Sequence, residues 1–185
     1  MKKVASLFAA ALILASPALA DEKEMVPSPA FASWSKHKPG TSTVFKFTMS
    51  AQGTSFGMEN HAELLEVTPE YVVINMWTVT EMGGRREGEK HKMKIEAMSE
   101  KRSSELPPGF TGSTEFVGDE EVTIGDKTYN CHVITFTGGM EGAQGTGKIW
   151  SSPEVPGGMI RMEMSGSGKE AFDMKGELME VQEKD

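Results

Sequence analysis

Residues 115–137 read EFVGDEEVTIGDKTYNCHVITFT and carry the pattern of a β-hairpin. Glu115–Ile124 and Lys127–Thr137 are rich in β-branched and aromatic residues, which favour strands. Between them, Gly125-Asp126 is a two-residue connection of the kind that closes tight hairpins. This pair of segments predicts an antiparallel architecture, and the same reasoning extends to the segments on either side.

Alternation of apolar and polar residues recurs on both sides of this hairpin. Tight turns separate most of the alternating segments, so consecutive strands should pair as an antiparallel meander. A sheet of about nine strands must curl on itself or split in two. The sequence therefore predicts a mainly β fold with a single curved antiparallel sheet, an open half-barrel or a barrel, and a two-sheet sandwich is the alternative. The remaining predicted strands are Thr43–Ala51, Thr54–Thr68, Tyr71–Met82, Lys90–Met98, Thr146–Ser151, Met159–Ser165 and Ala171–Gln182.

One short helix is predicted before the sheet. Ser28 is a suitable N-cap, Pro29 is a suitable first helical residue, and Pro39-Gly40 ends the helix. Phe31 and Trp34 are three residues apart and would share the helix face that packs on the sheet.

The first twenty residues have the features of a secretory signal peptide. Lys2 and Lys3 form a basic start, Val4–Ala15 is a short apolar segment, and Ala18-Leu19-Ala20 has the small residues of a cleavage site. We expect cleavage after Ala20, which would give a soluble protein in the periplasm or outside the cell. No later segment is long and apolar enough to span a membrane.

The remaining chain is predicted to hold one domain. Residues 21–28 are expected to be a flexible tail, and residues 29–182 to be a single β domain. Residues 99–114 interrupt the alternation and should form the longest loop. With Lys2 and Lys3 removed, 17 of the 19 basic residues remain against 27 acidic ones, a formal net charge of −10. That charge disfavours nucleic acid and anionic membranes as partners.

Residues 148–166, KIWSSPEVPGGMIRMEMSG, could be a chemical site or a turn. Pro153 and Pro156 cannot donate ladder hydrogen bonds, so they mark the end of a strand. Gly157-Gly158 allows the positive φ angles that a tight return needs. We interpret the stretch as a turn between two neighbouring antiparallel strands.

No combination of residues indicates catalysis. Gly142–Lys148 has the spacing of a phosphate-binding loop, but Ile149 stands where that motif needs Ser or Thr, which favours a hairpin loop. The four histidines lack zinc-site spacing, and no Gly-x-Ser-x-Gly nucleophile motif is present. Cys131, the only cysteine, alternates with Tyr129 and Val133 and is expected in the core. We therefore expect no enzymatic activity, no cofactor and no metal site.

Methionine is unusually frequent, with 14 residues in the chain. Met162 and Met164 would share one face of a strand, and two thioethers in such a position can bind Cu(I). Methionine also fills irregular cores and lines adaptable binding surfaces. The methionines are dispersed over almost every predicted strand, so we favour a core or cavity lining over a copper site.

Four segments resemble secreted bacterial proteins that are similar to the periplasmic lipoprotein-carrier (LolA-like) superfamily. They are Trp34-x-x-x-Lys38-Pro39-Gly40, Gly118–Val133, Lys148–Ser152 and Val155–Gly158. The resemblance implies an open antiparallel half-barrel whose apolar concave face is covered by a helical lid and carries acyl chains or lipoproteins. This chain lacks long lid helices, since only residues 29–37 and 99–106 could serve, and it offers no lipoprotein-handling residue to carry over.

These observations favour a non-enzymatic periplasmic or secreted binding protein. It would hold an apolar ligand, a lipid or an acyl chain, on the concave face of a curved sheet. The alternative is a structural or protein-interaction domain of the cell envelope without a small-molecule site, whose exposed edge strand binds the partner. The alternation predicts that eight residues share one inward apolar face, which either binds the ligand or fills a closed core. They are Phe45, Phe47, Phe56, Met58, Ile74, Met76, Phe172 and Met174.

Overall fold

The computed structural model describes residues 24–51, 53–81, 84–100, 111–140, 143–168 and 171–184. The predicted signal peptide, residues 1–20, lies outside the described residues. So do residues 101–110, which form most of the predicted loop 99–114.

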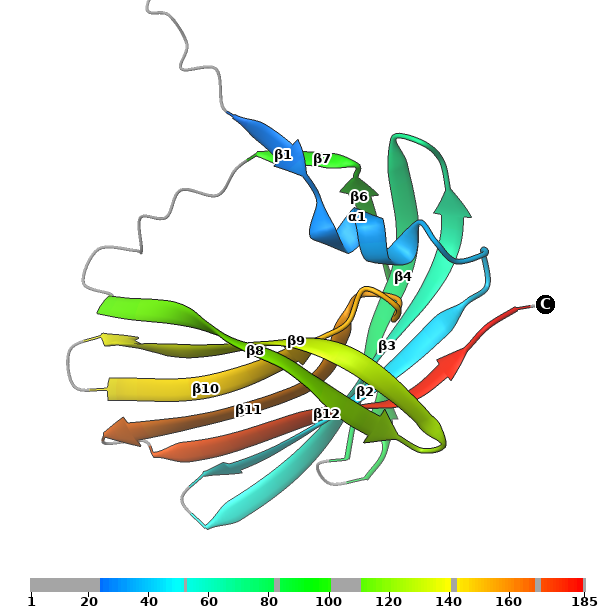
Figure 1. The fold of residues 1–185 in the computed structure, drawn as a ribbon. Helices are drawn as coiled ribbons and strands as arrows, with labels where there is room; N and C mark the ends of the chain where they lie inside the picture. Colours follow the sequence, from blue (N-terminus) through cyan, green and yellow to red (C-terminus); the bar gives the residue numbers. More distant parts are fainter. Residues whose placement is uncertain are drawn as a thin grey trace, which may run out of the picture.

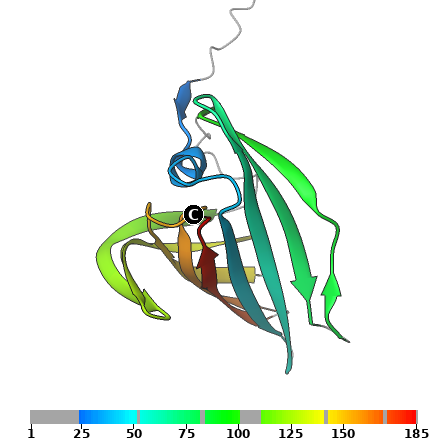
Figure 2. The same cartoon turned by 90° about the vertical axis from the view of Figure 1, so that its right-hand side faces the viewer.

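The described chain forms a large antiparallel sheet of ten strands (Figure 1). Its order is β5-β4-β3-β2-β12-β11-β10-β9-β8, and β6 pairs with β4 beside β5. The sheet is strongly twisted and curved, and the β8–β9 hairpin bends round at one end (Figure 2). This confirms the predicted single antiparallel sheet in its open form, not as a closed barrel. The strands are β2 (Ser42–Ala51), β3 (Thr54–Val67), β4 (Tyr71–Thr80), β5 (Arg86–Glu87), β6 (His91–Glu96), β8 (Thr111–Ile124), β9 (Lys127–Met140), β10 (Ala143–Ser151), β11 (Met159–Gly168) and β12 (Phe172–Gln182).

The predicted N-terminal helix is present as α1 (Pro29–Trp34). The Ser28 hydroxyl caps it by accepting a hydrogen bond from the Phe31 N–H at 3.2 Å. Trp34 is only 3% exposed and packs with Phe31 against the sheet, as the three-residue spacing predicted. The helix therefore covers one end of the sheet.

A short strand lies within the segment that the sequence predicts as a flexible tail. β1 (Met25–Pro27) pairs with β7 (Met98–Glu100), and the Ser28 N–H donates to the Ala97 carbonyl at 2.9 Å. This small second sheet holds the chain in place ahead of the helix. Its two strands have three residues each, which is too short for alternation to indicate them.

Two hydrophobic clusters stabilise the fold. The first joins the β8–β9 hairpin to the middle of the sheet, and the second lies beneath α1 on β3 and β4. The first contains Phe45, Val122, Tyr129, Cys131, Val133, Trp150, Val155, Ile160 and Leu178, and the second Trp34, Leu64, Val72 and Ile74.

The stretch 148–166 contains the predicted turn. β10 ends at Ser151 and β11 begins at Met159, and the two strands pair with each other. Gly157 and Gly158 both have positive φ, 81° and 77°, which side chains with a Cβ rarely adopt. The Gly158 carbonyl accepts from the Ser152 N–H at 2.8 Å and closes the turn.

Strands β9 and β10 are longer than the predicted segments Lys127–Thr137 and Thr146–Ser151. β9 reaches Met140 and β10 starts at Ala143. Gly145 lies opposite Gly138 in the ladder, and Gly147 lies opposite Phe136. Backbone pairing with neighbouring strands therefore overrides the weak strand propensity of glycine here.

Candidate binding faces of the sheet

The strand register divides the side chains of the sheet between two faces. Residues directly opposite each other in antiparallel strands share a face. One such row runs from β3 to β9 and has no charged residue: Phe56, Met49, Met174, Met164, Gly147 and Phe136. We call the side to which this row belongs the apolar face and the opposite side the polar face.

The register places all eight residues of the predicted inward face on the apolar face. They do not form one site, however. Phe45 and Ile74 are buried in the first and second clusters, and Phe47 and Met76 pack against those clusters. The other four are half-buried and belong to neither cluster: Phe56, Met58, Phe172 and Met174.

Six more residues continue this half-buried region. All lie on the apolar face, from β2 through β12 and β11 to β9, and none belongs to either cluster. Alternation already places Met49 with Phe45 and Phe47 and pairs Met162 with Met164, but only the register of the strands joins all six to one region. Together with the four predicted residues they form what we call the apolar patch: Met49, Phe56, Met58, Ile134, Phe136, Ile149, Met162, Met164, Phe172 and Met174.

Opposite charges alternate along the polar face. Arg161 on β11, Glu177 on β12, Lys46 on β2 and Glu59 on β3 are successive partners in the ladder. Arg161 donates from Nε to Glu177 Oε1 at 3.1 Å, and its Nη2 donates to the same oxygen. A second row alternates in the same way, with Glu163 on β11 between Lys148 on β10 and Lys175 on β12. The register therefore places the charged residues of both rows next to residues of opposite charge.

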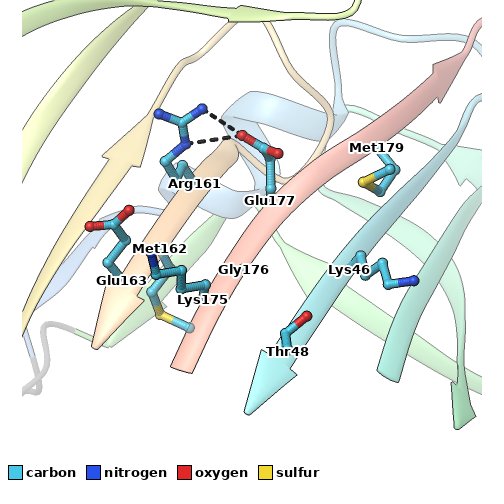
Figure 3. Close-up of a pocket in the computed structure, with 9 residues that line it drawn as sticks. All are labelled: Lys46, Thr48, Arg161, Met162, Glu163, Lys175, Gly176, Glu177 and Met179. Carbon is cyan, nitrogen blue, oxygen red and sulfur yellow. Dashed lines mark hydrogen bonds and ion pairs between the residues drawn. The ribbon is translucent and has the colours of Figure 1, made fainter. Parts of the chain in front are cut away.

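Two grooves lie on this polar face. A groove of about 300 Å³ runs over β11, β12 and β2 beside the Arg161–Glu177 ion pair (Figure 3). A wider one of about 780 Å³ extends from β9 to β2. The polar-face side chains that line the wider groove are Ser50, Thr135, Thr137, Thr146, Lys148, Glu163, Ser165, Asp173 and Lys175.

Glu120 connects the β8–β9 hairpin to β10. Its carboxylate accepts from Lys148 Nζ at 2.7 Å and from Trp150 Nε1 at 2.7 Å. The hydrogen bond from Lys148, and then that from Trp150, lower the pKa of Glu120. The ionised carboxylate therefore holds the hairpin over the indole of a core residue.

Another group of polar contacts lies around His61 on β3 and Trp77 on β4. His61 stacks on Trp77 with ring centroids 5.0 Å apart, and Lys90 lies 4.1 Å from the centre of the Trp77 ring. Burial acts to raise the pKa of Glu59, but its hydrogen bond with His61 and the charge of Arg85 outweigh burial and lower it. The indole that covers His61 is on the neighbouring strand, so the sequence alone did not indicate this contact.

The described residues contain no group of three or more His, Cys, Asp or Glu side chains that could hold a metal ion. Cys131 is buried, and burial raises the pKa of its thiol. Over the same part of the chain, no helix is long and apolar enough to cross a membrane.

Comparisons with known proteins support the fold. No family model matches the sequence, and no curated protein matches it. A predicted lipoprotein from Parabacteroides distasonis is similar at 14% identity over 79% of this chain and 96% of its own, with a TM-score of 0.50. A predicted exported protein with a YmcC-like fold from Bacteroides fragilis matches at 13% identity over 80% and 97%, with a TM-score of 0.51.

A LolA superfamily protein from Nitrosomonas europaea is also found, at 9% identity over 86% of this chain and 94% of its own, with a TM-score of 0.26. The two similarities with TM-scores of 0.50 and 0.51 support the fold. At 14% and 13% identity they support nothing beyond the fold.

Proposed function

We propose that this chain is a non-enzymatic binding protein that holds an apolar chain, such as the acyl chain of a lipid, against the apolar patch. The observation that carries the proposal is the half-burial of ten apolar side chains on one uncharged region of the sheet. Uncharged apolar regions of this kind on a protein surface commonly bind ligands or partners.

The patch suits an acyl chain better than the grooves do. The grooves are lined by many charged side chains, among them the Arg161–Glu177 ion pair and Lys148, which pairs with Glu120. An acyl chain there would have to cover these charges. The patch combines rigid phenylalanines with flexible methionines, which adapt to irregular apolar ligands. Each buried methylene contributes about 0.8 kcal/mol, so roughly ten would offset a large part of the cost of association.

The proposal places the protein outside the cytoplasm. Residues 1–20 have the features of a signal peptide, and two structural matches are predicted to be a lipoprotein and an exported protein. The mass of the protein from a native secretory host should correspond to a chain that begins at Asp21. A mass that includes residues 1–20 would contradict this.

The ligand can be tested with two variants of one strand. Met49 lies in the apolar patch, whereas its neighbour Thr48 lies on the polar face and is exposed. We expect the purified chain from Asp21 to carry lipid detectable by mass spectrometry and to bind a fluorescent fatty acid. Met49→Lys should weaken that binding strongly, and Thr48→Lys should leave it unchanged. Protein that carries no lipid and binds no fatty acid would overturn the proposal, as would equal effects of the two substitutions.

The edge of the sheet supports a second candidate, a protein-interaction domain. β8 is the last strand of the sheet in the described part of the chain, and it presents Phe116 and Val117 at 61% and 54% exposure. An exposed apolar edge can pair with a strand of a partner. Pull-downs from envelope extract should then recover one protein in stoichiometric amount, and Val117→Lys should abolish its recovery. Recovery unchanged by Val117→Lys would dismiss this candidate.

A further inference from the structure

The structure brings together methionines that are far apart in the sequence. Met49 on β2 is the direct ladder partner of Met174 on β12, and Met174 is the direct partner of Met164 on β11. The three side chains therefore form one row across three adjacent strands. We call this set the methionine row.

The spacing of the row allows the three thioethers to converge. Directly opposite side chains in antiparallel strands have Cβ atoms about 4.5–5.5 Å apart. Met174 occupies the middle, so the sulfur atoms of Met49 and Met164 can approach its sulfur from both sides. Methionine has three rotatable side-chain bonds, which lets the sulfur atoms adjust to a common centre.

The surroundings of the row select the kind of metal. The next positions of the same row are Phe56 and Gly147, and the Phe136 ring lies against Gly147, so no carboxylate, amine or imidazole belongs to the row. Hard cations need oxygen ligands, and Zn²⁺ prefers thiolate or imidazole. Thioether ligands favour Cu(I), a soft monovalent ion. Half-burial of the three side chains limits competition from water.

We propose that Met49, Met164 and Met174 bind one Cu(I) ion through their three sulfur atoms. Met162 is on the same face, two residues before Met164, and can supply a fourth sulfur. The sequence pattern offered only Met162 and Met164 of one strand as a Cu(I) pair, and it could not place Met49 and Met174 beside them because they come from separate segments. This proposal does not depend on lipid binding, although the two sites overlap.

Substitution by leucine separates the two roles of these residues. Leucine is close to methionine in volume and polarity, so the apolar surface is kept while the sulfur ligand is lost. The test variant combines Met49→Leu, Met164→Leu and Met174→Leu. The control combines Met76→Leu, Met159→Leu and Met179→Leu, which removes the same number of sulfur atoms outside the row.

The experiment is an anaerobic titration of each protein against the Cu(I)–bicinchoninate complex. We expect the wild type and the control to withdraw one equivalent of Cu(I). The row variant should bind at least about 100-fold more weakly, since even outer-shell partners of a metal are worth roughly 10- to 100-fold. X-ray absorption of the loaded wild type should show sulfur ligands only.

Three outcomes would overturn the metal site: a wild type that withdraws no Cu(I), equal curves for the two variants, or nitrogen ligands in the absorption spectrum. Circular dichroism and thermal melting confirm that both variants are folded. Fatty-acid binding by the row variant should persist, so failure of the metal site and failure of the lipid site are distinguishable.

Discussion

At the scale of single residues, three glycines on the apolar face lie directly opposite aromatic side chains. Gly147 faces Phe136, Gly166 faces Phe172, and Gly176 faces Phe47. In each pair the ring lies where a Cβ of the glycine would be. The rings thus replace the missing side chains, and the glycines are required by packing, not by backbone conformation.

Gly147→Ala should therefore destabilise the protein. An added Cβ would lie 2.2 Å from Phe136 Cζ and 2.8 Å from the Glu163 carbonyl oxygen, and the second of these atoms is backbone. Overpacking of this kind costs about 1–3 kcal/mol. Gly145 is the matched control, because its added Cβ would come no closer than 3.5 Å to any atom. Gly145→Ala should change the free energy of unfolding by less than about 1 kcal/mol in urea denaturation. Equal effects of the two substitutions would contradict this account.

His37 should make stability depend on pH. Its side chain is 11% exposed, and its Nε2 is buried without a hydrogen-bond partner among the described residues. Burial lowers the pKa of His37 below its ordinary value of 6.5, while Glu183 opposes this effect and Lys36 adds to it. As the pH falls, the unfolded chain therefore binds the proton at a higher pH than the folded chain does. The stability that neutral His37 contributes is complete above pH 6.5 and decreases as the pH falls through the folded-state pKa.

The measurement is the free energy of unfolding between about pH 7.5 and pH 5. His37→Gln should flatten its pH dependence relative to the wild type. His91→Gln serves as the control, since His91 is exposed on β6 and should leave the dependence as it is. A wild-type slope that survives His37→Gln would mean that other groups cause it.

At the scale of elements, the β8–β9 hairpin depends on one carboxylate. Glu120 receives charge-assisted hydrogen bonds from β10, and Cys131, its ladder partner on β9, is 1% exposed beneath it. A thiol reagent can reach Cys131 only after the hairpin opens. Labelling of this single cysteine is therefore a direct measure of hairpin opening.

Glu120→Gln should accelerate the labelling of Cys131 in the folded protein, because it removes the charge that Lys148 and Trp150 bind. Glu121→Gln is the control, since Glu121 is the next residue on the same strand and faces the other way. The measured quantity is the rate of reaction with Ellman's reagent under native conditions. If the wild type reacted as fast as the unfolded chain, the thiol would be accessible without any opening of the hairpin.

Prediction from sequence succeeded where the determinant is local. Alternation located nine of the ten strands of the large sheet and the face shared by Phe45, Phe56 and Phe172, and Ser28-Pro29 located the start of the helix. The strand that was missed, β5, has two residues in a charged loop. Alternation along a strand does not specify which strand lies beside it, so the methionine row and the Glu120 contacts could not be predicted.

At the scale of the whole molecule, the last strand of the chain lies inside the sheet. β12 pairs with β11 on one side and with β2 on the other, so it joins the earliest and latest strands of the sheet. Leu178 of β12 is fully buried in the first cluster, and Val181 packs against the same cluster. The meander from β2 to β11 therefore cannot complete its core until β12 is in place.

A chain that ends at residue 170 should lose cooperative unfolding. Without β12, the edges of β2 and β11 have no partner and the first cluster lacks Leu178, so the sheet separates into two parts with exposed apolar surface. A chain that ends at Gln182 keeps β12 and should melt close to the full-length protein. Thermal melting by circular dichroism and binding of the dye ANS measure the difference.

Adding a synthetic peptide of residues 171–182 to the shorter chain should restore a cooperative transition, because the gap between β2 and β11 accepts a strand of that sequence. A cooperative transition in the shorter chain without the peptide would show that the central strand is dispensable.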